Sequence, residues 1–284
     1  MTATATAAKN LSVNELETLA LTIRRNVIDI CMQRGGYAGQ GVALADLGAC
    51  LYFHEMRPDG RGWYHDRFVN SNGHDAIMDY AAFAEQGLYT LEQLRTYNAD
   101  GTKVDMSPCE GQAGFEITMG SLGQGPSQAA GIAYGERLRG SDKRVYCLFS
   151  DGELQEGNVW EASMFAGHHR LDNLCYIIDN NNLQAGGATK GILNVEPVPE
   201  KFQAFGFAAR RINGNSISQI LEAFEEARNT KGRPFAIVLD TQLFEGCDYM
   251  KERFPAAHFM ATQDIHWQAA LDELNHKIAD RPAS

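Results

Sequence analysis

The chain has 284 residues, of which 44% are hydrophobic, so it can bury the core of one large domain or two small ones. Its formal net charge of -11 excludes a general binder of nucleic acids or anionic membranes, because those surfaces are themselves negative. A phosphorylated substrate stays compatible with the sequence, since a local basic site can lie in an acidic protein.

The N-terminal residues and the spacing of the cysteines indicate where in the cell the protein is expected to be. No stretch approaches the roughly 20 apolar residues of a membrane helix, and residues 1–10 (MTATATAAKN) lack the apolar core of a signal peptide. We expect residues 1–10 to be a disordered tail and residues 11–284 to be one domain. The six cysteines form no Cys-x-x-Cys pair, which is typical of a reduced cytoplasmic protein.

Helical spacing of apolar residues dominates the first part of the chain. Ser12 and Glu15 form a capping-box pattern at the start of the first helix, and Thr90 is a suitable N-cap for a later, short one. The predicted helices cover residues 12–33, 42–56, 75–86 and 91–97, with a short strand at 66–70 and a surface loop at 98–115.

Strands then alternate with helices. The predicted strands cover residues 145–149, 174–178, 205–212 and 235–240. The predicted helices run from Pro126 to about residue 139, from Ser216 to residue 229, and over 262–277, and residues 186–199 are expected to form a long loop. This alternation predicts an α/β fold, a doubly wound parallel sheet with helices on both faces.

Oxygen-bearing side chains follow two of these strands. One strand ends in Ser150, Asp151 and Gly152, and the next ends in residues 179–182, Asp-Asn-Asn-Asn. In a parallel sheet both turns lie at the carboxyl edge, where ligands bind. The Asp151 carboxylate and the Asn181 amide oxygen suit Mg²⁺ or Ca²⁺, and Gly152 permits close approach of a phosphate. Asp-Gly and Asn-Asn are also ordinary turn formers, so these residues alone leave a plain βαβ unit open.

Three short blocks resemble one known family. Residues 151–157 (DGELQEG), with the later Asn181, are similar to the thiamine-diphosphate motif, although Ser150 stands where its first glycine is usual. Residues 71–74 (SNGH) and 120–125 (GSLGQG) resemble transketolase blocks, and all three follow the family's order. The chain therefore resembles the N-terminal, thiamine-diphosphate-binding subunit of a split transketolase, and it is expected to share that family's fold.

The resemblance implies a cofactor, thiamine diphosphate, and a divalent metal, Mg²⁺ or Ca²⁺. Asp151 and Asn181 match the family's metal ligands, and Leu183 would supply a backbone carbonyl. Gly152 and His74 match contacts on the diphosphate side of the cofactor. Asn181 is expected to contact the cofactor there as well. Taken by itself, a single histidine such as His74 would more often make a structural hydrogen bond.

Further residues are implied on the other sides of the cofactor. Gly120 and Leu122 match contacts to its aminopyrimidine. Glu156 matches an acidic residue that links the cofactor sites across the family's subunit interface, and His258 matches a late substrate-side histidine. His74, Glu156 and His258 are thus the candidate catalytic residues. Glu156 is also compatible with a solvated glutamate in the first turn of a helix, and His258 with a surface position.

Two family histidines that face the substrate are replaced. Where transketolases carry Gly-His-Pro-Gly after the first helix, this chain has Tyr37 at the histidine position. An ungapped alignment places Met106 at the second such histidine. These changes concern the substrate side and leave the diphosphate side intact, so we expect substrates other than the ordinary sugar phosphates.

The family's second half supplies the glutamate that activates the aminopyrimidine. We expect a second transketolase-like subunit with that pyrimidine-side domain, an α2β2 heterotetramer, and activity only in the complex. The expected reaction transfers a two-carbon ketol or related acyl unit from a small-molecule donor to an aldehyde or ketone acceptor. Neither nucleic acid nor membrane is an expected partner.

Two alternatives stay open at this point. The α subunit of a 2-oxoacid dehydrogenase or acetoin-cleaving complex shares the metal motif but is not expected to carry the other two blocks together. A non-catalytic subunit that keeps the cofactor fold for assembly is disfavoured by the intact Asp151, Asn181 and His74. Tyr37 and Met106 keep that second alternative open.

Overall fold

A five-stranded parallel sheet forms the centre of the molecule. The computed structural model describes residues 11–59, 63–261 and 264–281, so the tail expected at residues 1–10 lies outside the described residues. The strand order is β1-β2-β3-β7-β6, and every neighbouring pair is parallel. The strands are β1 (Arg67–Asn70), β2 (Val145–Ser150), β3 (Leu174–Asn180), β6 (Ala208–Asn213) and β7 (Phe235–Asp240).

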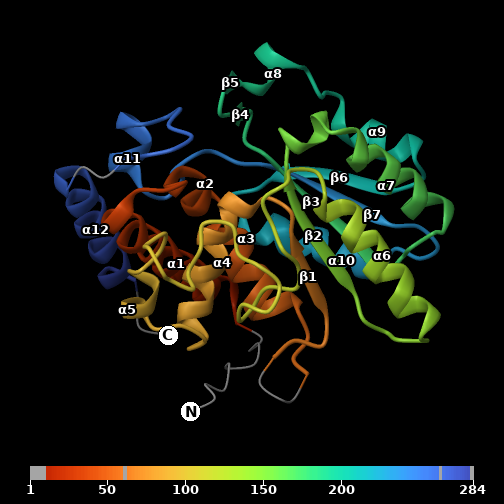
Figure 1. Ribbon diagram of the computed structural model, residues 1–284, viewed down its shortest axis with the longest axis horizontal. Coiled ribbons are helices and arrows are strands. Elements are labelled where there is room, and N and C mark those ends of the chain that lie inside the picture. Colours follow the sequence, from red (N-terminus) through yellow and green to blue (C-terminus); the bar gives the residue numbers. More distant parts are fainter. Residues whose placement is uncertain (1–10, 60–62, 262–263, 282–284) are drawn as a thin grey trace.

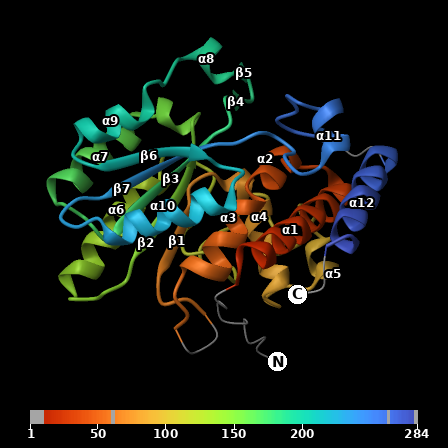
Figure 2. The same ribbon diagram turned by 180° about the vertical axis from the view of Figure 1, so that it is seen from behind.

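Helices cover both faces of this sheet, which confirms the predicted fold class (Figure 1). The helix α6 (Gly125–Leu138) lies in front of the sheet in Figure 1, and α10 (Ile217–Asn229) lies in front of it in Figure 2. The first face also carries α7 (Gly157–His168) and α9 (Val198–Ala204). The second face carries α1 (Val13–Arg34), α2 (Ala38–Ala43), α3 (Ala45–Cys50) and α4 (Ala76–Glu85), and α12 (Asp264–Ala279) packs on α1.

Two hydrophobic clusters lie on opposite faces of the sheet, and alternate side chains of each strand belong to one cluster or the other. Tyr146 and Leu148 of β2 belong to the cluster under α10, whereas Cys147 and Phe149 belong to the one under α6. Successive side chains of a strand point to opposite faces, and all four are fully buried. A strand that is buried on both faces appears in the sequence as a continuous apolar run, as here.

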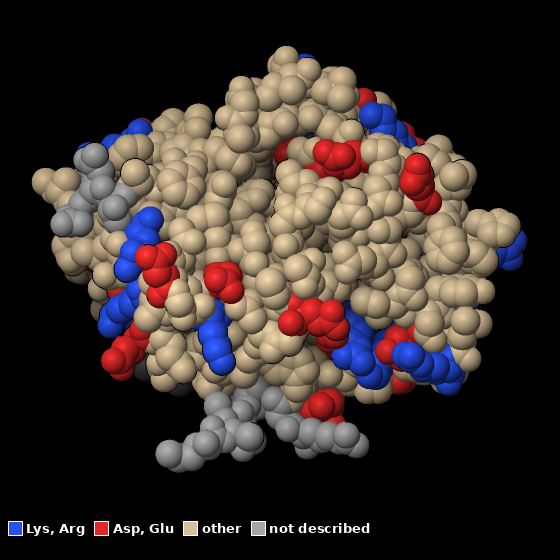
Figure 3. Space-filling view, in the orientation of Figure 1, with Lys and Arg blue, Asp and Glu red and all other residues tan. Residues whose placement is uncertain are grey.

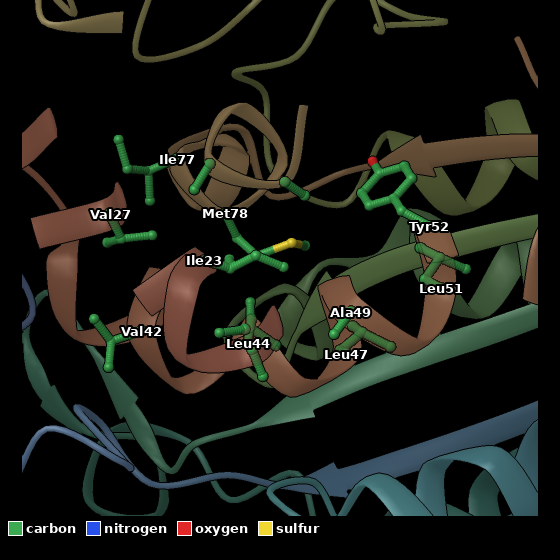
Figure 4. Packing of buried hydrophobic residues seen from close by; sticks show 14 of the residues in the cluster. Ile23, Val27, Val42, Leu44, Leu47, Ala49, Leu51, Tyr52, Ile77 and Met78 are labelled. Atoms are coloured by element: carbon green, nitrogen blue, oxygen red, sulfur yellow. The ribbon is translucent and has the colours of Figure 1, made fainter. Parts of the chain in front are cut away.

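Glycines allow the first helices to approach closely. A Cβ at Gly41 would lie 2.5 Å from Ile77 Cγ2, and one at Gly48 would lie 2.5 Å from Met78 Sδ. Figure 4 shows Ile23, Leu44 and Met78 converging between these helices. The close approach buries α2 and α3 entirely between α1, α4 and the sheet.

Several predicted boundaries need correction. The single helix expected at 42–56 is three pieces, α2, α3 and the π-helix Leu51–Glu55. The chain leaves helical geometry at Leu44 (φ -84°, ψ 1°), which separates α2 from α3, whereas the π-helix continues directly from α3. The strand expected at 205–212 begins only at Ala208, since Phe205 ends α9 and Gly206 (φ 91°) turns the chain. Ser216 does precede α10, but its side chain makes no capping hydrogen bond.

Short elements were missed. The helices α9 and α11 (Asp248–Arg253) span 7 and 6 residues, too few for a helical period to stand out. The expected loop at 186–199 contains half of a hairpin, β4 (Leu183–Gln184) with β5 (Gly187–Ala188), and α8 (Thr189–Ile192). The last helix begins at Asp264, and residues 262–263 lie outside the described part of the chain.

The capping box predicted at Ser12 and the N-cap predicted at Thr90 are both confirmed, and Thr90 also belongs to a capping box. Ser12 and Glu15 bond reciprocally at the start of α1, and Thr90 and Gln93 do so at α5 (Leu91–Leu94). In the described part of the chain, no helix is long and apolar enough to cross a membrane. Acidic and basic side chains are interspersed on the face that Figure 3 shows, without a continuous basic patch.

Candidate functional site

The three sequence blocks meet at the carboxyl edge of the sheet. Residues 71–74 follow β1, and the segment from Asp151 follows β2, while residues 181–183 follow β3, and these strands are neighbours in the sheet. The Asp151 amide donates to the Asp179 carbonyl at 2.9 Å, which joins the turns after β2 and β3. The Gly125 amide donates to Ser71 Oγ at 3.0 Å, which joins the glycine-rich block to β1.

Glu153 connects all three blocks, and the sequence reasoning missed it. Its Oε1 accepts from Ser71 Oγ at 2.5 Å and from the Gly123 amide at 2.8 Å. Its Oε2 accepts from the Ser150 amide at 2.8 Å. The side chain is fully buried, and burial raises its pKa while these donors oppose the rise. The sequence signal was present, because Glu153 lies inside the 151–157 block.

The SNGH and glycine-rich blocks touch through Gly73. A Cβ at Gly73 would lie 3.0 Å from Ser107 Oγ and 3.2 Å from the Gly120 amide nitrogen. Gly120 has φ 127°, a conformation that favours glycine. Leu122 is 40% exposed, so its side chain is available to a ligand or a partner. The backbone of Gly120 therefore lies beside the turn that carries His74.

Asp151 is a buried carboxylate without a hydrogen bond. Neither carboxylate oxygen has a hydrogen-bond partner in the described chain, and the buried Thr189 hydroxyl likewise has none. Burial, with a smaller contribution from the Asp179 carboxylate, raises the pKa of Asp151 to about 7. The nearby Thr189 hydroxyl and the amides of Gly152 and Asn182 oppose that rise.

Asn181 and Leu183 lie on the turn that follows β3. Asn181 Nδ2 donates to Asp179 Oδ2 at 2.6 Å, and its Oδ1 accepts from the Leu183 amide at 2.8 Å. An amide oxygen has two lone pairs, so Oδ1 keeps one for a cation. These bonds orient the Asn181 side chain. Gly152, after β2, lies near this turn, because its Cβ would be 3.7 Å from Gln184 Cβ.

Buried carboxyl groups cluster near Asp151. Five carboxyl groups have no exposure at all, and they are Asp75, Asp79, Asp151, Glu153 and Asp179. Within residues 11–59, 63–261 and 264–281, none of these five pairs with a lysine or arginine. Burial raises the pKa of Asp179 to about 6 and that of Asp75 well above its usual range.

A divalent cation fits this environment. It would supply the missing positive charge and a partner for the unpaired Asp151 oxygens, and hard oxygen donors are what Mg²⁺ and Ca²⁺ prefer. No three His, Cys, Asp or Glu side chains converge as a metal site in the described part of the chain. The candidate set is of another kind, since it has one carboxylate, one amide and one backbone carbonyl.

A cluster of aromatic rings borders the site on the α2 side. The ring centroid of His74 lies 4.4 Å from that of Tyr37 and 5.3 Å from that of His258. The Tyr37 centroid also lies 5.2 Å from that of His258 and 5.3 Å from that of Phe259. The structure thus places His258 beside His74, although the sequence was also compatible with a surface position for His258. Tyr37 contacts both histidines.

A backbone bridge brings His258 into this cluster. Gly36 and Met260 exchange two hydrogen bonds of 3.0 Å as an isolated antiparallel bridge. A Cβ at Gly35 would lie 2.3 Å from the Met260 carbonyl oxygen, so the approach requires a glycine there. This contact holds residues 257–260 against the segment that precedes α2.

Both histidines are held in the neutral form. Burial, together with the neighbouring His258, lowers the pKa of His74 to about 3. Burial also lowers the pKa of His258. Neutral imidazoles can each donate one hydrogen bond and accept one, so the pair offers two donors to an oxygen-rich ligand.

Glu156 and Met106 lie apart from these rings. Glu156 is exposed at the N-terminus of α7, and a Cβ at Gly123 would lie 2.6 Å from Glu156 Cβ, so this glutamate stands against the glycine-rich block. An exposed acid at this position can reach a partner subunit. Met106 is half-buried and packs against the larger hydrophobic cluster rather than joining the rings of His74 and Tyr37.

Comparison with known proteins agrees with this arrangement. Residues 16–266 match the family model described as the thiamine diphosphate binding domain of transketolase. The chain is 41% identical over 258 residues to an uncharacterised transketolase family protein of Sinorhizobium fredii, with 89% of this chain and 92% of that protein covered.

Two further relatives are named as transketolase subunits. The chain is 36% identical to one of a Clostridium species, named for 6-deoxy-6-sulfo-D-fructose, and 32% identical to one of Actinobacillus succinogenes, named for apulose 4-phosphate. Each alignment covers 93% of this chain and 98% of the relative. Among solved structures, a transketolase variant of Pichia stipitis superposes with a TM-score of 0.82 at 26% identity, over 96% of this chain and 42% of that one.

Proposed function

The chain belongs to the transketolase family, and we propose that it is the diphosphate-binding subunit of a two-component enzyme that transfers a two-carbon ketol unit to an aldehyde acceptor. When bound, thiamine diphosphate supplies the reactive carbon and the electron sink that this carbon–carbon chemistry needs. The protein's own residues bind and orient that group and its substrate.

The observation that carries the proposal is the unpaired Asp151 carboxylate at the carboxyl edge of the sheet. A buried carboxylate without a partner is costly in its ionised form, which supports a cation as its partner in the working protein. Asp151, the Asn181 amide oxygen and the Leu183 carbonyl would hold Mg²⁺ or Ca²⁺. A divalent ion placed there would neutralise the diphosphate of the cofactor.

The remaining cofactor contacts would come from the three blocks. Gly152 would allow the diphosphate to approach the backbone, and His74 would donate a hydrogen bond to it. The Gly120 backbone and the exposed Leu122 side chain would contact the aminopyrimidine. These assignments are supported by the close approach of the Gly73 and Gly120 turns.

On the substrate side we propose His258 as a hydrogen-bond donor and Tyr37 as a determinant of specificity. Both rings lie against His74, and Tyr37 replaces a family histidine. Of the two relatives named as transketolase subunits, one is named for 6-deoxy-6-sulfo-D-fructose and the other for apulose 4-phosphate. We therefore propose a modified ketose as the donor of the ketol unit.

A second subunit with the pyrimidine-side domain is the proposed partner, in an α2β2 assembly. Relatives that align over 98% of their length are named as subunits, which supports a split enzyme. Glu156 is exposed beside the glycine-rich block and would face that partner. The six free cysteines support the proposed cytoplasmic location.

The test is reconstitution. The purified chain, the partner subunit, thiamine diphosphate and Mg²⁺ are mixed with a ketose donor and an aldehyde acceptor, and product formation is followed. Activity is expected only when both subunits are present. Turnover by this chain alone would refute the split enzyme, and a stable but inactive complex across all donors would favour a non-catalytic assembly role.

A further inference from the structure

Gln40 is a buried polar residue that the cofactor assignments leave unused. It lies on α2, three residues after Tyr37, and has no exposure. The neighbouring Gly39 carbonyl accepts from the Phe244 amide at 3.1 Å, and a Cβ at Gly39 would lie 3.3 Å from the Ala257 carbonyl oxygen. The start of α2 is therefore packed directly on the segment that carries His258.

The side chain of Gln40 faces the ring of His258. Gln40 Nε2 lies 2.6 Å from His258 Nδ1. An amide nitrogen can only donate, so Nδ1 is the acceptor in this contact, and a neutral imidazole then carries its proton on Nε2. Gln40 Oε1 is buried and has no hydrogen-bond partner in the described part of the chain, which leaves an acceptor for a water or a substrate hydroxyl.

We propose that Gln40 is a positioning residue that fixes His258 in its Nε2–H tautomer and so makes it a neutral hydrogen-bond donor on the substrate side of the site. The identity of the oxygen ligand that receives this bond rests on the proposed function. The tautomer itself does not, because it follows from the contact between Gln40 and His258 in this chain.

The surroundings of His258 agree with this role. The titratable groups that face it are the rings of His74 and Tyr37, at 5.3 and 5.2 Å between centroids. Among the described residues, no Asp, Glu, Lys or Arg forms an ion pair or hydrogen bond with His258. A positive charge on the ring would turn Nδ1 into a second donor facing Gln40 Nε2, so the contact disfavours protonation.

The direct test is nitrogen-15 nuclear magnetic resonance of the full chain without cofactor, with the His258 signals identified by their loss in His258→Asn. In the wild type at neutral pH we expect a protonated Nε2 and an unprotonated Nδ1. Gln40→Met should release the ring to a mixture of tautomers. Gln40→Glu should draw the proton to Nδ1 and raise the pKa of His258 by about one unit or more.

The wild-type spectrum alone can overturn the proposal, since a proton on Nδ1 contradicts it whatever the variants do. The same tautomer and pKa in the wild type, Gln40→Met and Gln40→Glu would overturn it as well. Gln128→Glu, an equal charge change at an exposed position on α6, is the matched control and should leave His258 unchanged.

Kinetics of the reconstituted complex give the second readout. In the plot of kcat/KM against pH, Gln40→Glu should move the acidic limb to higher pH by the pKa shift measured for His258. Gln40→Met should lower kcat/KM about tenfold, which corresponds to the loss of one hydrogen bond. An unmoved limb in Gln40→Glu would contradict a role in positioning. If the resonances behave as expected but no ketol donor reacts, the proposed function fails and the tautomer assignment stands.

Discussion

The Ser71 hydroxyl donates to Glu153 Oε1 at 2.5 Å, although the two residues are 82 positions apart in the chain. Ser71 Oγ in turn accepts from the Gly125 amide. With Gly123 and Ser150 also donating to the same carboxylate, one side chain sets the relative position of the turns after β1 and β2 and of the glycine-rich block. The geometry of the proposed cofactor site therefore depends on a residue that need not touch the cofactor.

The first prediction concerns Glu153→Gln. Both carboxylate oxygens accept from donors, and an amide offers only one oxygen, so its NH₂ group would face a donor whichever way it turns. We expect a loss of about 1–3 kcal/mol in the free energy of unfolding, the cost of leaving a buried polar group unpaired. Urea unfolding of both proteins measures this loss.

A matched control separates this effect from the change of charge. Glu161→Gln alters an exposed glutamate on α7 and should change stability by less than about 0.5 kcal/mol. If Glu153→Gln unfolds at the same urea concentration as that control, the connecting role of Glu153 is wrong.

The second prediction concerns Asp151→Asn. Without metal, near pH 8, the variant should be more stable than the wild type by about 1–3 kcal/mol, because a buried unpaired charge is removed. The sign follows from the pKa of Asp151, which is raised to about 7, so the stability linked to this group is lost as the pH rises through 7. With Mg²⁺ and thiamine diphosphate at about 1,000 times their dissociation constants, the wild type should gain about 4.1 kcal/mol and the variant should gain almost nothing.

The order of stabilities should thus reverse when the ligands are added, which a general structural defect cannot produce. Asp46→Asn is the contrasting control. Asp46 is buried but paired with Arg24 at 2.5 Å, so its variant should lose stability without ligands and still respond to them. Equal stabilisation of Asp151→Asn and the wild type by Mg²⁺ and the cofactor would exclude Asp151 as a metal ligand.

The third prediction is a pH dependence that comes from His74. Its pKa is lowered from 6.5 to about 3, so the unfolded chain takes up the proton first as the pH falls. The stability contributed by the neutral ring is complete above 6.5 and is lost on the way down to about 3. At about pH 5 the loss should be roughly 2 kcal/mol.

Urea unfolding of the wild type and His74→Gln at about pH 7.5 and about pH 5 measures this loss. The wild type should lose about 2 kcal/mol more than the variant between the two conditions. The buried carboxyl groups are present in both proteins, so the difference isolates His74. Equal losses would mean that the ring is not held neutral.

Much of the fold follows from local sequence signals. The capping box at Ser12, the N-cap at Thr90 and the apolar runs of β2, β3 and β7 depend on residues within one element, and the structure has them where they were expected. The meeting of residues 71–74 with the turns that carry Asp151 and Asn181 also follows from topology, because parallel strands that are neighbours place their carboxyl ends on one edge.

Contacts between distant residues were not predictable in the same way. Glu153 appeared only as part of an acidic run, because its partners lie 30 and 82 positions away. Gln40 and His258 are 218 positions apart and are brought together by the bridge between Gly36 and Met260. One sequence contains no trace of such pairings, so the roles of the individual site residues stay predictions.

Tyr37 is the residue through which we expect this protein to differ from ordinary transketolases. Its phenol keeps a hydroxyl donor, whereas a histidine is the side chain suited to carrying protons at neutral pH. Its ring packs on both His74 and His258, so it also fills space beside them. A donor that needs firm hydrogen bonds to a hydroxyl there would lose roughly 0.5–1.5 kcal/mol for each neutral bond.

The last prediction is therefore a donor preference that Tyr37→His should change. With one aldehyde acceptor, the reconstituted complex should use a modified ketose with a higher kcat/KM than xylulose 5-phosphate or fructose 6-phosphate. Tyr37→His should raise kcat/KM for the two ordinary ketose phosphates by about 2- to 10-fold, the equivalent of one neutral hydrogen bond, and should lower it for the preferred donor. Tyr37→Phe is the control that keeps the ring and removes the hydroxyl, and it should improve neither phosphate. If the wild-type complex already uses xylulose 5-phosphate as well as any other donor, the partner subunit supplies the missing contacts and Tyr37 does not determine the substrate.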